Sequence, residues 1–377
     1  MPDWPEAMGS PGADYLVVGG GIVGAACARE LAQPGATVDL LEQEFIGGGA
    51  TSAGMGHLVT IRGVPGELEL TSLGVEMWRS APAELLRCAE YVRAGTLWIA
   101  TSAADTEALQ RQAQAFGALG IEASLLDARA LAAAEPALSG AALAGMRVAG
   151  DAIIYPPKAA QWLARDAGRG RIRVHQGVRA RAVGADWVLA ADGRRFEASA
   201  VIVAAGLAAR RLLPGLPLLA KRGHLLISER GAPRISHQIL ELGYAASTHA
   251  QDAVSIAFNV QPRPSGQLLI GASREIGVEE RAESLEVLAR IARRAVHFLP
   301  GLATSRVIRA WTGLRPATPQ GMPMLGAVAL PAAAGRVWVA VGHEGLGATT
   351  ALISARILAA KIRAEALPAG LAGGFDA

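Results

Sequence analysis

The most specific chemical signal in the sequence is the glycine-rich turn Gly19-Gly20-Gly21-Ile22-Val23-Gly24. It has the spacing G-x-G-x-x-G, follows an apolar segment and precedes a helical one. Gly19 would permit a tight turn, Gly21 would let the backbone approach a pyrophosphate, and Gly24 would let helix and strand pack closely. The helix N-terminus would supply amide donors and a favourable dipole. The pattern therefore predicts a dinucleotide site.

An acidic residue stands where such a site needs one. Glu42 lies 23 residues beyond Gly19, at the end of a second apolar segment. A carboxylate there accepts hydrogen bonds from a ribose diol and would repel a 2′-phosphate, so NADP is disfavoured. The alternative is an ordinary tight turn in a chain rich in Ala and Gly, and the surrounding strand–turn–helix pattern argues against it.

Three separated blocks, residues 14–42, 171–211 and 336–360, would position these residues. Each joins apolar strands to glycine turns, and the first reads as a βαβ unit. The expected strands are 15–18, 37–41, 173–181, 187–191, 200–205 and 337–341, and the expected helices are 22–31 and 348–360.

Segments of a different character separate these blocks. Residues 67–143 read as mostly helical, and 279–298 as an amphipathic helix. Residues 223–271 alternate apolar and polar types, as in an antiparallel sheet with one exposed face. We therefore expect an α/β fold, α+β overall, with a discontinuous Rossmann-like domain and a second domain of antiparallel sheet plus helices. The expected bounds are 13–80, 150–222 and 310–370 for the first domain, and 81–149 and 223–309 for the second.

The composition excludes several classes of protein. Of the 377 residues, 51% are hydrophobic and 18% are charged, which supports a buried core and argues against disorder. A dispersed net charge of +3 does not make a nucleic-acid face. Two cysteines cannot build a disulfide framework or a zinc site, and His343-Glu344 lacks the second histidine of H-E-x-x-H, so we expect no metal. Without a secretory signal or a membrane span, we expect a cytoplasmic protein.

Three further motifs follow in order along the chain: 47–57 (GGGATSAGMGH), 311–319 (WTGLRPATP) and 342–347 (GHEGLG). Together with the first glycine turn, they resemble the D-amino-acid oxidase/glycine oxidase family of FAD-dependent oxidoreductases. The resemblance covers essentially the whole chain and is most specific near its two ends. It implies a discontinuous FAD-binding domain, a sheet-roofed substrate domain and an active site between them.

The resemblance assigns the FAD contacts residue by residue. It implies that the helix N-terminus after the last turn faces the flavin pyrimidine, where its amides would stabilise the negative charge of the reduced ring. FAD is expected to be noncovalent, because neither Cys27 nor Cys88 matches the cysteine used by covalent members. The implied contacts are Gly19, Gly21, Ile22, Val23, Gly24, Glu42 and Gln43 for the ADP half, Thr51, Ser52, Gly54 and Met55 for the ribityl chain and ring, Val178 for the adenine, and Ala205, Gly206, Gly342, Gly345, Leu346 and Gly347 for the later turns.

Arg315 is the expected substrate-binding residue. The resemblance implies that an arginine at this position pairs with the substrate carboxylate, and a planar guanidinium suits bidentate pairing. The alternative is a surface or interdomain ion pair. The flanking Gly313, Pro316 and Pro319 favour a rigid loop and a functional role.

Four other side chains are weaker candidates. His57 and His343 follow the flavin-contacting turns and would reach the flavin or the substrate, or else be packed or solvent-facing histidines. Tyr244 would cap the pocket or pack in the second sheet. His224 would begin the first strand of that sheet, and we expect least of it.

The resemblance implies an FAD-dependent dehydrogenase that oxidises the Cα–N bond of a small D-amino or imino acid, by hydride transfer to flavin N5 that gives an imine. Residues 51–58 look most like D-hydroxyproline dehydrogenases and related cyanide-producing glycine dehydrogenases, so D-hydroxyproline or a similar cyclic D-imino acid is the expected substrate. The alternatives are a glycine/sarcosine oxidase, a broad D-amino-acid dehydrogenase, a flavoprotein subunit of a larger electron-transfer complex, and a dinucleotide-binding sensor. The electron acceptor would be oxygen, a quinone or a partner protein, and a homo-oligomer is compatible with the sequence.

Overall fold

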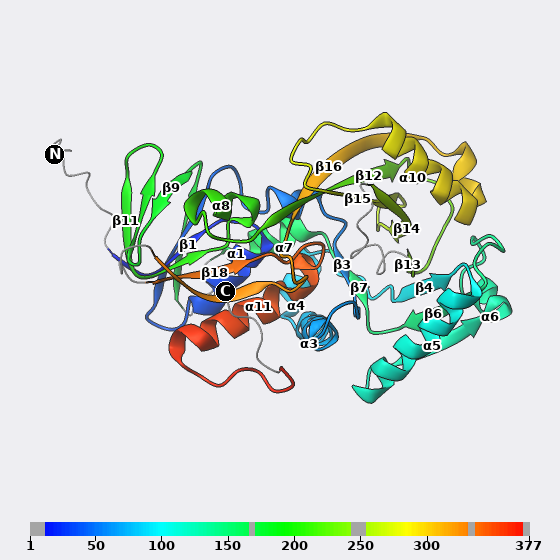
Figure 1. Cartoon of the computed structure of the whole chain (residues 1–377), viewed down its shortest axis with the longest axis horizontal. Helices are drawn as coiled ribbons and strands as arrows, with labels where there is room; N and C mark the ends of the chain where they lie inside the picture. Colours follow the sequence, from blue (N-terminus) through cyan, green and yellow to red (C-terminus); the bar gives the residue numbers. More distant parts are fainter. Residues whose placement is uncertain (1–11, 166–169, 243–253, 331–335, 372–377) are drawn as a thin grey trace.

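The computed structural model describes residues 12–165, 170–242, 254–330 and 336–371 of the chain. Two eight-stranded sheets form the two halves of the molecule, with a helical layer between and around them (Figure 1). A third, two-stranded sheet joins β3 (His57–Leu58) to β7 (Ala152–Ile153). The expected α/β fold with a discontinuous nucleotide-binding part is confirmed.

The first sheet is mainly parallel and has the order β17-β18-β11-β1-β2-β8, with β9 and β10 extending it as an antiparallel hairpin beside β11. Its strands come from three distant parts of the chain, as expected. They are β1 (Ala13–Val18), β2 (Thr37–Glu42), β8 (Arg171–Gln176), β9 (Ala180–Val183), β10 (Trp187–Ala190), β11 (Arg195–Val203), β17 (Met324–Ala329) and β18 (Arg336–Val341).

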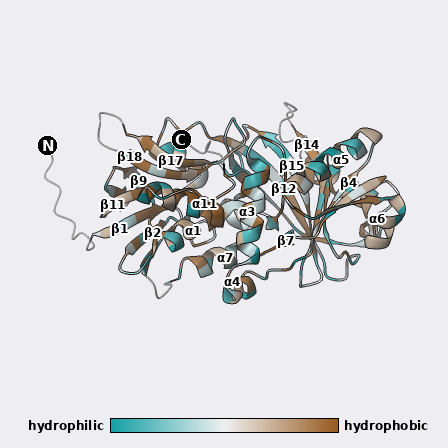
Figure 2. Cartoon of the chain, turned by 90° about the horizontal axis from the view of Figure 1, so that it is seen from below, coloured by the Kyte–Doolittle hydropathy of each residue, from teal (hydrophilic) through white to brown (hydrophobic). Residues whose placement is uncertain are grey.

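Both faces of this sheet are buried. Successive side chains of a strand point to opposite faces, and on each face they pack into a hydrophobic cluster. On β1, Val17 packs into one hydrophobic cluster, and Leu16 and Val18 pack into another. Figure 2 shows the resulting hydrophobic colouring along β1, β11 and β18. The first cluster is closed by α1 (Ile22–Leu31), α3 (Glu67–Arg79), α4 (Ala83–Cys88), α7 (Pro156–Leu163) and α11 (Gly347–Arg363), and the second by α8 (Ala209–Leu212) and the segment after it.

The second sheet has the order β16-β12-β15-β14-β13-β4-β6-β5, and all its pairs are antiparallel except β13 with β4. Helix α10 (Leu285–Phe298) covers one face and α5 (Ala103–Ala118) covers the other near β4. Its strands are β4 (Thr96–Ala100), β5 (Ala123–Asp127), β6 (Ala144–Val148), β12 (Leu219–Ser228), β13 (Gln238–Glu241), β14 (Ser255–Pro262), β15 (Leu268–Ile276) and β16 (Val307–Ala317), and the short helices α2 (Ala50–Ala53) and α6 (Ala128–Ala134) lie beside it.

The structure corrects four expectations about these elements. Residues 67–143 hold strands β4 and β5 as well as helices, because β4 is buried on both faces and carries no alternating pattern. Strand β14 has no exposed face. The expected strand 173–181 is divided between β8, which pairs with β2, and β9, which pairs with β10. Strand β12 begins at Leu219, before His224.

The two-domain division remains a prediction. Strands β12 and β16 pair along their whole length and run across the expected boundaries at 222/223 and 309/310. Within the part of the chain that the structure describes, no helix combines the length and the apolar character that crossing a bilayer requires.

Candidate functional site

A cavity of about 650 Å³ is lined by both large sheets. The first sheet contributes the carboxyl ends of β1, β2, β11 and β18, and the second contributes β12, β14, β15 and β16. Cavities of 300–1,000 Å³ are typical of small-molecule and cofactor sites. In open α/β sheets, ligands bind beyond the carboxyl ends of the strands, which is where this cavity lies.

The first glycine turn forms one wall of the cavity. Gly19 has a φ of +111°, and a Cβ atom there would overlap the carbonyl group of Ala204. Gly21 faces the cavity, and an added Cβ would meet Thr51 Oγ1 at 3.1 Å. Gly24 does not line the cavity: its Cβ would overlap the Gly19 carbonyl oxygen, so this glycine lets α1 pack against β1. Thr51 Oγ1 accepts a 3.0 Å hydrogen bond from the Ile22 amide and holds its loop at the N-terminus of α1.

Glu42 ends β2 with its side chain in the cavity wall. Its carboxylate accepts hydrogen bonds from the amides of Gly20, at 2.7 Å, and Glu44, at 2.8 Å. A carboxylate has about four lone-pair positions, so acceptor capacity is left for a diol. The Val178 amide donates to the Glu42 carbonyl at 2.9 Å, which brings Val178 to the same end of the cavity.

The last glycine turn closes the opposite end. Gly342 has a φ of +83°, and α11 begins at Gly347. The turn is tied to β16, because the Glu344 amide donates to the Pro316 carbonyl at 2.8 Å and His343 forms a bridge with Ala317. The sequence motifs 311–319 and 342–347 are therefore side by side.

These residues fit a bound dinucleotide. The cavity wall holds a carboxylate with spare acceptors, several glycines without side chains, and the N-termini of two helices. The structure places these sequence-predicted residues on the cavity wall: Gly19, Gly21, Ile22, Val23, Glu42, Gln43, Thr51, Gly54, Met55, His57, Val178, Ala205, Gly206, Arg315, Gly342, His343, Gly345 and Gly347.

Three predicted residues that the structure describes are not on that wall. Besides Gly24, Ser52 is exposed and donates to the Gly49 carbonyl at 3.0 Å. Leu346 precedes α11 and packs against the hydrophobic cluster under β4. Tyr244 lies outside the described residues.

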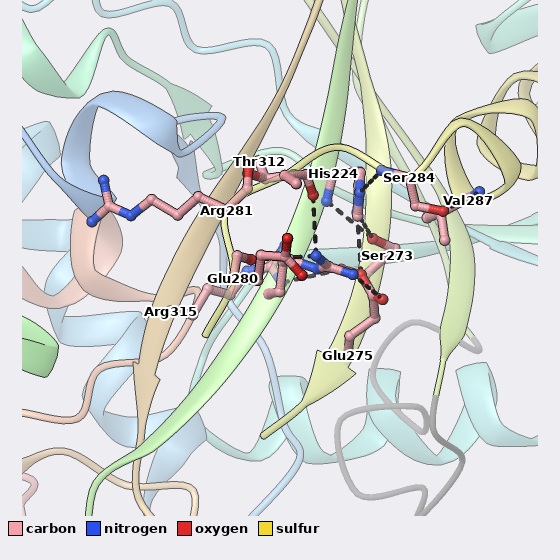
Figure 3. A network of polar contacts seen from close by, with 11 residues as sticks. His224, Ser273, Glu275, Glu280, Arg281, Ser284, Val287, Thr312 and Arg315 are labelled. Atoms are coloured by element: carbon pink, nitrogen blue, oxygen red, sulfur yellow. Dashed lines mark hydrogen bonds and ion pairs between the residues drawn. The ribbon is translucent and has the colours of Figure 1, made fainter. Parts of the chain in front are cut away.

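Arg315 lies in strand β16 and not in the expected loop. In the strand register, Arg315 stands opposite Lys221 of β12. Strand β16 is the edge of the second sheet, so Pro316, which has no amide hydrogen, removes no hydrogen bond from the interior of the sheet. The guanidinium crosses over Gly223, where a Cβ atom would collide with it. Its Nη1 donates to the Ser273 carbonyl at 3.1 Å, which leaves most of its donors for a ligand (Figure 3).

A polar network behind Arg315 holds the segment 277–284 (Figure 3). Arg222 forms a bidentate ion pair with Glu275, at 2.9 and 2.7 Å, and also donates to the carbonyls of Glu280 and Ala282. His224 Nε2 accepts from the Ser284 amide at 2.9 Å. His224 is fully buried in this network, and burial lowers its pKa. The contacts of Arg222 and His224 hold the residues on either side of Arg281, and Arg281 lines the cavity.

Glu344 is a cavity residue that the sequence reasoning missed. It has a φ of +48°, and its Oε1 lies 3.1 Å from Arg274 Nε and 3.6 Å from Lys221 Nζ. Burial opposes its ionisation, but the cations Arg274, Lys221 and Arg315 hold the pKa of Glu344 below its usual range. The sequence argument for this turn used only its glycines. The acidic residue among them was the feature of the sequence that could have identified Glu344 as a cavity residue.

Both candidate histidines line the cavity. Burial lowers the pKa of His343 to about 4, and its Nε2 lies 3.0 Å from Ser354 Oγ. Burial also lowers the pKa of His57, against the opposing influence of the Gln238 and Asn259 side chains. Both rings are therefore neutral at pH 7. Asn259 is a second missed residue, hidden because its strand was expected to expose one polar face.

The chain was compared with known families, proteins and structures. Residues 14–361 match the model of the family described as DAO, FAD dependent oxidoreductase. The chain is 27% identical over 332 residues to glycine oxidase of Geobacillus kaustophilus (strain HTA426), covering 83% of this chain and 84% of that protein. It is 24% identical over 416 residues to D-amino acid dehydrogenase of Methylobacterium sp. (strain 4-46), covering 91% and 94%.

The fold is also similar to that of a solved glycine oxidase. The crystal structure of glycine oxidase from Geobacillus kaustophilus matches with a TM-score of 0.83 and 23% identity, over 95% of this chain and 96% of that one. Because the family model spans nearly all of the described residues, the chain belongs to the DAO family of FAD-dependent oxidoreductases, and FAD is its cofactor.

Proposed function

We propose that this enzyme oxidises the Cα–N bond of a small D-amino or imino acid, with D-hydroxyproline as the preferred substrate. The observation that carries the proposal is the position of Arg315 in the same cavity as the three glycine-rich segments. The similarity to a D-amino acid dehydrogenase and to glycine oxidases supports the substrate class. The similarity of residues 51–58 to D-hydroxyproline dehydrogenases supports the preferred substrate.

Arg315 would bind the substrate carboxylate in a bidentate pair. Arg315 lies near Lys221, Arg274 and Glu344, since all three cations lower the pKa of the Glu344 carboxyl. Because Arg315 lies on a paired strand over Gly223, its position is restricted, and so is that of the bound substrate.

Bound FAD supplies the acceptor for the α-hydrogen, which leaves the substrate as a hydride. The neutral amine nitrogen provides the electron pair that forms the C=N bond, and the resulting iminium loses a proton to give the imine. Met55 packs with Leu225, Leu269 and Ala272 into an apolar cluster at the roof of the cavity. This cluster excludes water, and positioning with desolvation provides the catalysis without an obligatory protein base.

The site roles and the domain bounds predicted from the sequence form part of this proposal. Glycine or sarcosine oxidation is the second candidate, because glycine oxidases are among the relatives. In both cases oxygen, a quinone or a partner protein would reoxidise the flavin.

An anaerobic screen of D-, L- and cyclic amino acids tests the proposal by the bleaching of the flavin. A cyclic D-imino acid should reduce the flavin faster than its L-enantiomer, because the α-hydrogen must face the cofactor while the carboxylate stays on Arg315. Equal rates for both enantiomers, or reduction by glycine and sarcosine alone, would favour the second candidate. Reoxidation with oxygen or with a quinone then identifies the acceptor.

A further inference from the structure

Three buried polar side-chain atoms of residues on the cavity wall have no hydrogen-bond partner among the described residues. His57 Nε2 is buried without a hydrogen bond, and so are both amide atoms of Asn259, whose exposed fraction is 1%. Both residues line the cavity. A buried polar atom without a partner costs about 1–3 kcal/mol, so such atoms in a cavity indicate a polar ligand group.

The hydrogen bonds of Gln238 determine which nitrogen of His57 carries the proton. Gln238 Nε2 donates to the Ala152 carbonyl at 3.1 Å and to Thr96 Oγ1 at 2.9 Å. Its Oε1 therefore faces His57 Nδ1, with which it is in hydrogen-bond contact. Because an amide oxygen only accepts, Nδ1 must donate, and the neutral ring presents the lone pair of Nε2 to the cavity.

Asn259 complements this acceptor. Its side-chain amide offers a donor, Nδ2, and an acceptor, Oδ1. Asn259 stands opposite Leu240, two residues along β13 from Gln238, and therefore on the same face as the side chain that contacts His57. One acceptor and one donor side by side suit a hydroxyl group, which donates its hydrogen to one and accepts from the other. The amine of the substrate does not suit this pair, because its nitrogen has one lone pair in the reactive form. The reaction requires that lone pair to be free of hydrogen bonds.

The spacing suits a small substrate. Asn259 lies on β14, opposite Gly271 of β15, and β15 pairs with β12, whose Gly223 lies under the Arg315 guanidinium. Two strand spacings and an offset of two residues along β12 separate the positions, which together amount to about 12 Å. A cyclic imino acid with its carboxylate on Arg315 would direct a ring substituent toward His57 and Asn259.

We propose that His57 and Asn259 bind a hydroxyl group of the substrate, with the hydroxyl donating to His57 Nε2 and accepting from Asn259 Nδ2, and that Gln238 is the positioning residue that sets His57 as the acceptor. The proposal rests on the proposed function and deepens it. It assigns the discrimination between D-hydroxyproline and D-proline to three side chains, those of Gln238 and Asn259 on the second sheet and of His57 on β3. A site built for a hydroxyl disfavours the analogue that lacks it, because the buried groups then stay unpaired.

The test compares kcat/KM for cis-4-hydroxy-D-proline and for D-proline on the FAD-loaded enzyme. The wild type should prefer the hydroxylated substrate by about 5- to 150-fold. Asn259→Leu should remove most of this preference by slowing the hydroxylated substrate alone. Gln238→Met should reduce the preference partly while D-proline turnover is kept, since the proton on His57 is no longer directed to Nδ1.

Gln261→Met is the matched control. Gln261 lies on the same strand and face as Asn259, is equally buried, and also has an unpaired amide, but it does not line the cavity. Its replacement should leave the hydroxyl preference unchanged. A similar loss in this variant would assign the effect to packing of β14 and overturn the proposal.

Two other results would overturn it. Equal wild-type kcat/KM for the two imino acids would defeat the hydroxyl site while D-imino acid oxidation stands. A weaker FAD affinity in Asn259→Leu with an unchanged preference would assign the amide to the cofactor. If neither imino acid reduces the flavin, the proposed function fails, and the hydroxyl site is then measured with D-serine against D-alanine, where the absence of a preference for D-serine overturns it.

Discussion

The two large sheets face the same cavity, but they contribute to it in different ways. The first sheet presents mostly backbone, in glycine turns and helix N-termini, together with carboxylates such as that of Glu42, which already binds two amides. The second presents side chains from separate strands, Arg315 on β16 and Asn259 on β14. Backbone donors suit the invariant phosphates of a cofactor, whereas side chains let a fold change its substrate. We therefore expect changes in the first sheet to alter cofactor retention and changes in the second to alter substrate use.

Replacing Arg315 should produce the largest effect and should leave the cofactor in place. Arg315→Met removes one partner of a desolvated charge pair, which typically costs about 2–5 kcal/mol, or about 30- to 5,000-fold in kcat/KM. Much of the loss should appear as a raised KM, because the carboxylate is bound in the ground state and the transition state alike.

Steady-state kinetics on a carboxylated amine and on an amine without a carboxylate measure the effect, with the flavin spectrum as the check on occupancy. The second substrate should be nearly unaffected. Wild-type turnover of the carboxylated substrate would show that Arg315 is structural.

The reciprocal change is Glu42→Lys. It replaces the acceptor for a ribose diol with a donor and deprives the Gly20 and Glu44 amides of their acceptor. FAD affinity should fall by about 10- to 100-fold, while KM measured on the FAD-saturated enzyme stays close to that of the wild type. Titration of the apoprotein with FAD checks this, and an unchanged affinity would remove Glu42 from the cofactor site. Acid precipitation of the wild type should release intact FAD into the supernatant.

The buried His343 should make the turn before α11 sensitive to acid. Its pKa is lowered from 6.5 to about 4 in the folded protein, so the unfolded chain binds the extra proton as the pH falls through 6.5. The histidine should therefore cost about 2 kcal/mol of stability between pH 8 and pH 5. Unfolding free energies at both pH values should show a smaller loss in His343→Gln, and equal losses would mean that the ring is not held neutral.

The smallest effect tests the support beneath Arg315. Gly223→Ala places a methyl group where the guanidinium crosses β12, so the arginine must shift. We expect KM to rise by about fivefold, with FAD affinity unchanged, since a displaced bidentate pair loses about 1 kcal/mol. Gly117→Ala is the control, because Gly117 lies in α5 with open space around it and should become slightly more stable. If both variants have wild-type KM values, the contact between Gly223 and Arg315 does not restrict the arginine.

Many of the elements in and beside the first sheet follow from local sequence, although β17 and the division between β8 and β9 do not. Helix α1 spans the predicted residues 22–31, and β18 and α11 extend their predicted ranges by a few residues only. The G-x-G-x-x-G spacing acts within one turn, where a positive φ at Gly19 and the close approach of Gly24 are properties of neighbouring residues. Buried parallel strands also carry uninterrupted apolar runs that are visible along the chain.

What the sequence determined by itself is most of the glycine-rich wall of the cavity, together with the identity of Arg315 as a cavity residue. Only the tertiary structure showed that Arg315 lies on an edge strand, that Glu344 stands among three cations, and that Asn259 and Gln238 meet His57. These contacts join residues of different strands and turns, up to about 200 positions apart, and pairing over such separations leaves no local pattern. A lone polar residue in a strand looks the same in the sequence whether it faces solvent or a cavity, because the packing of the second sheet against the first decides which it is.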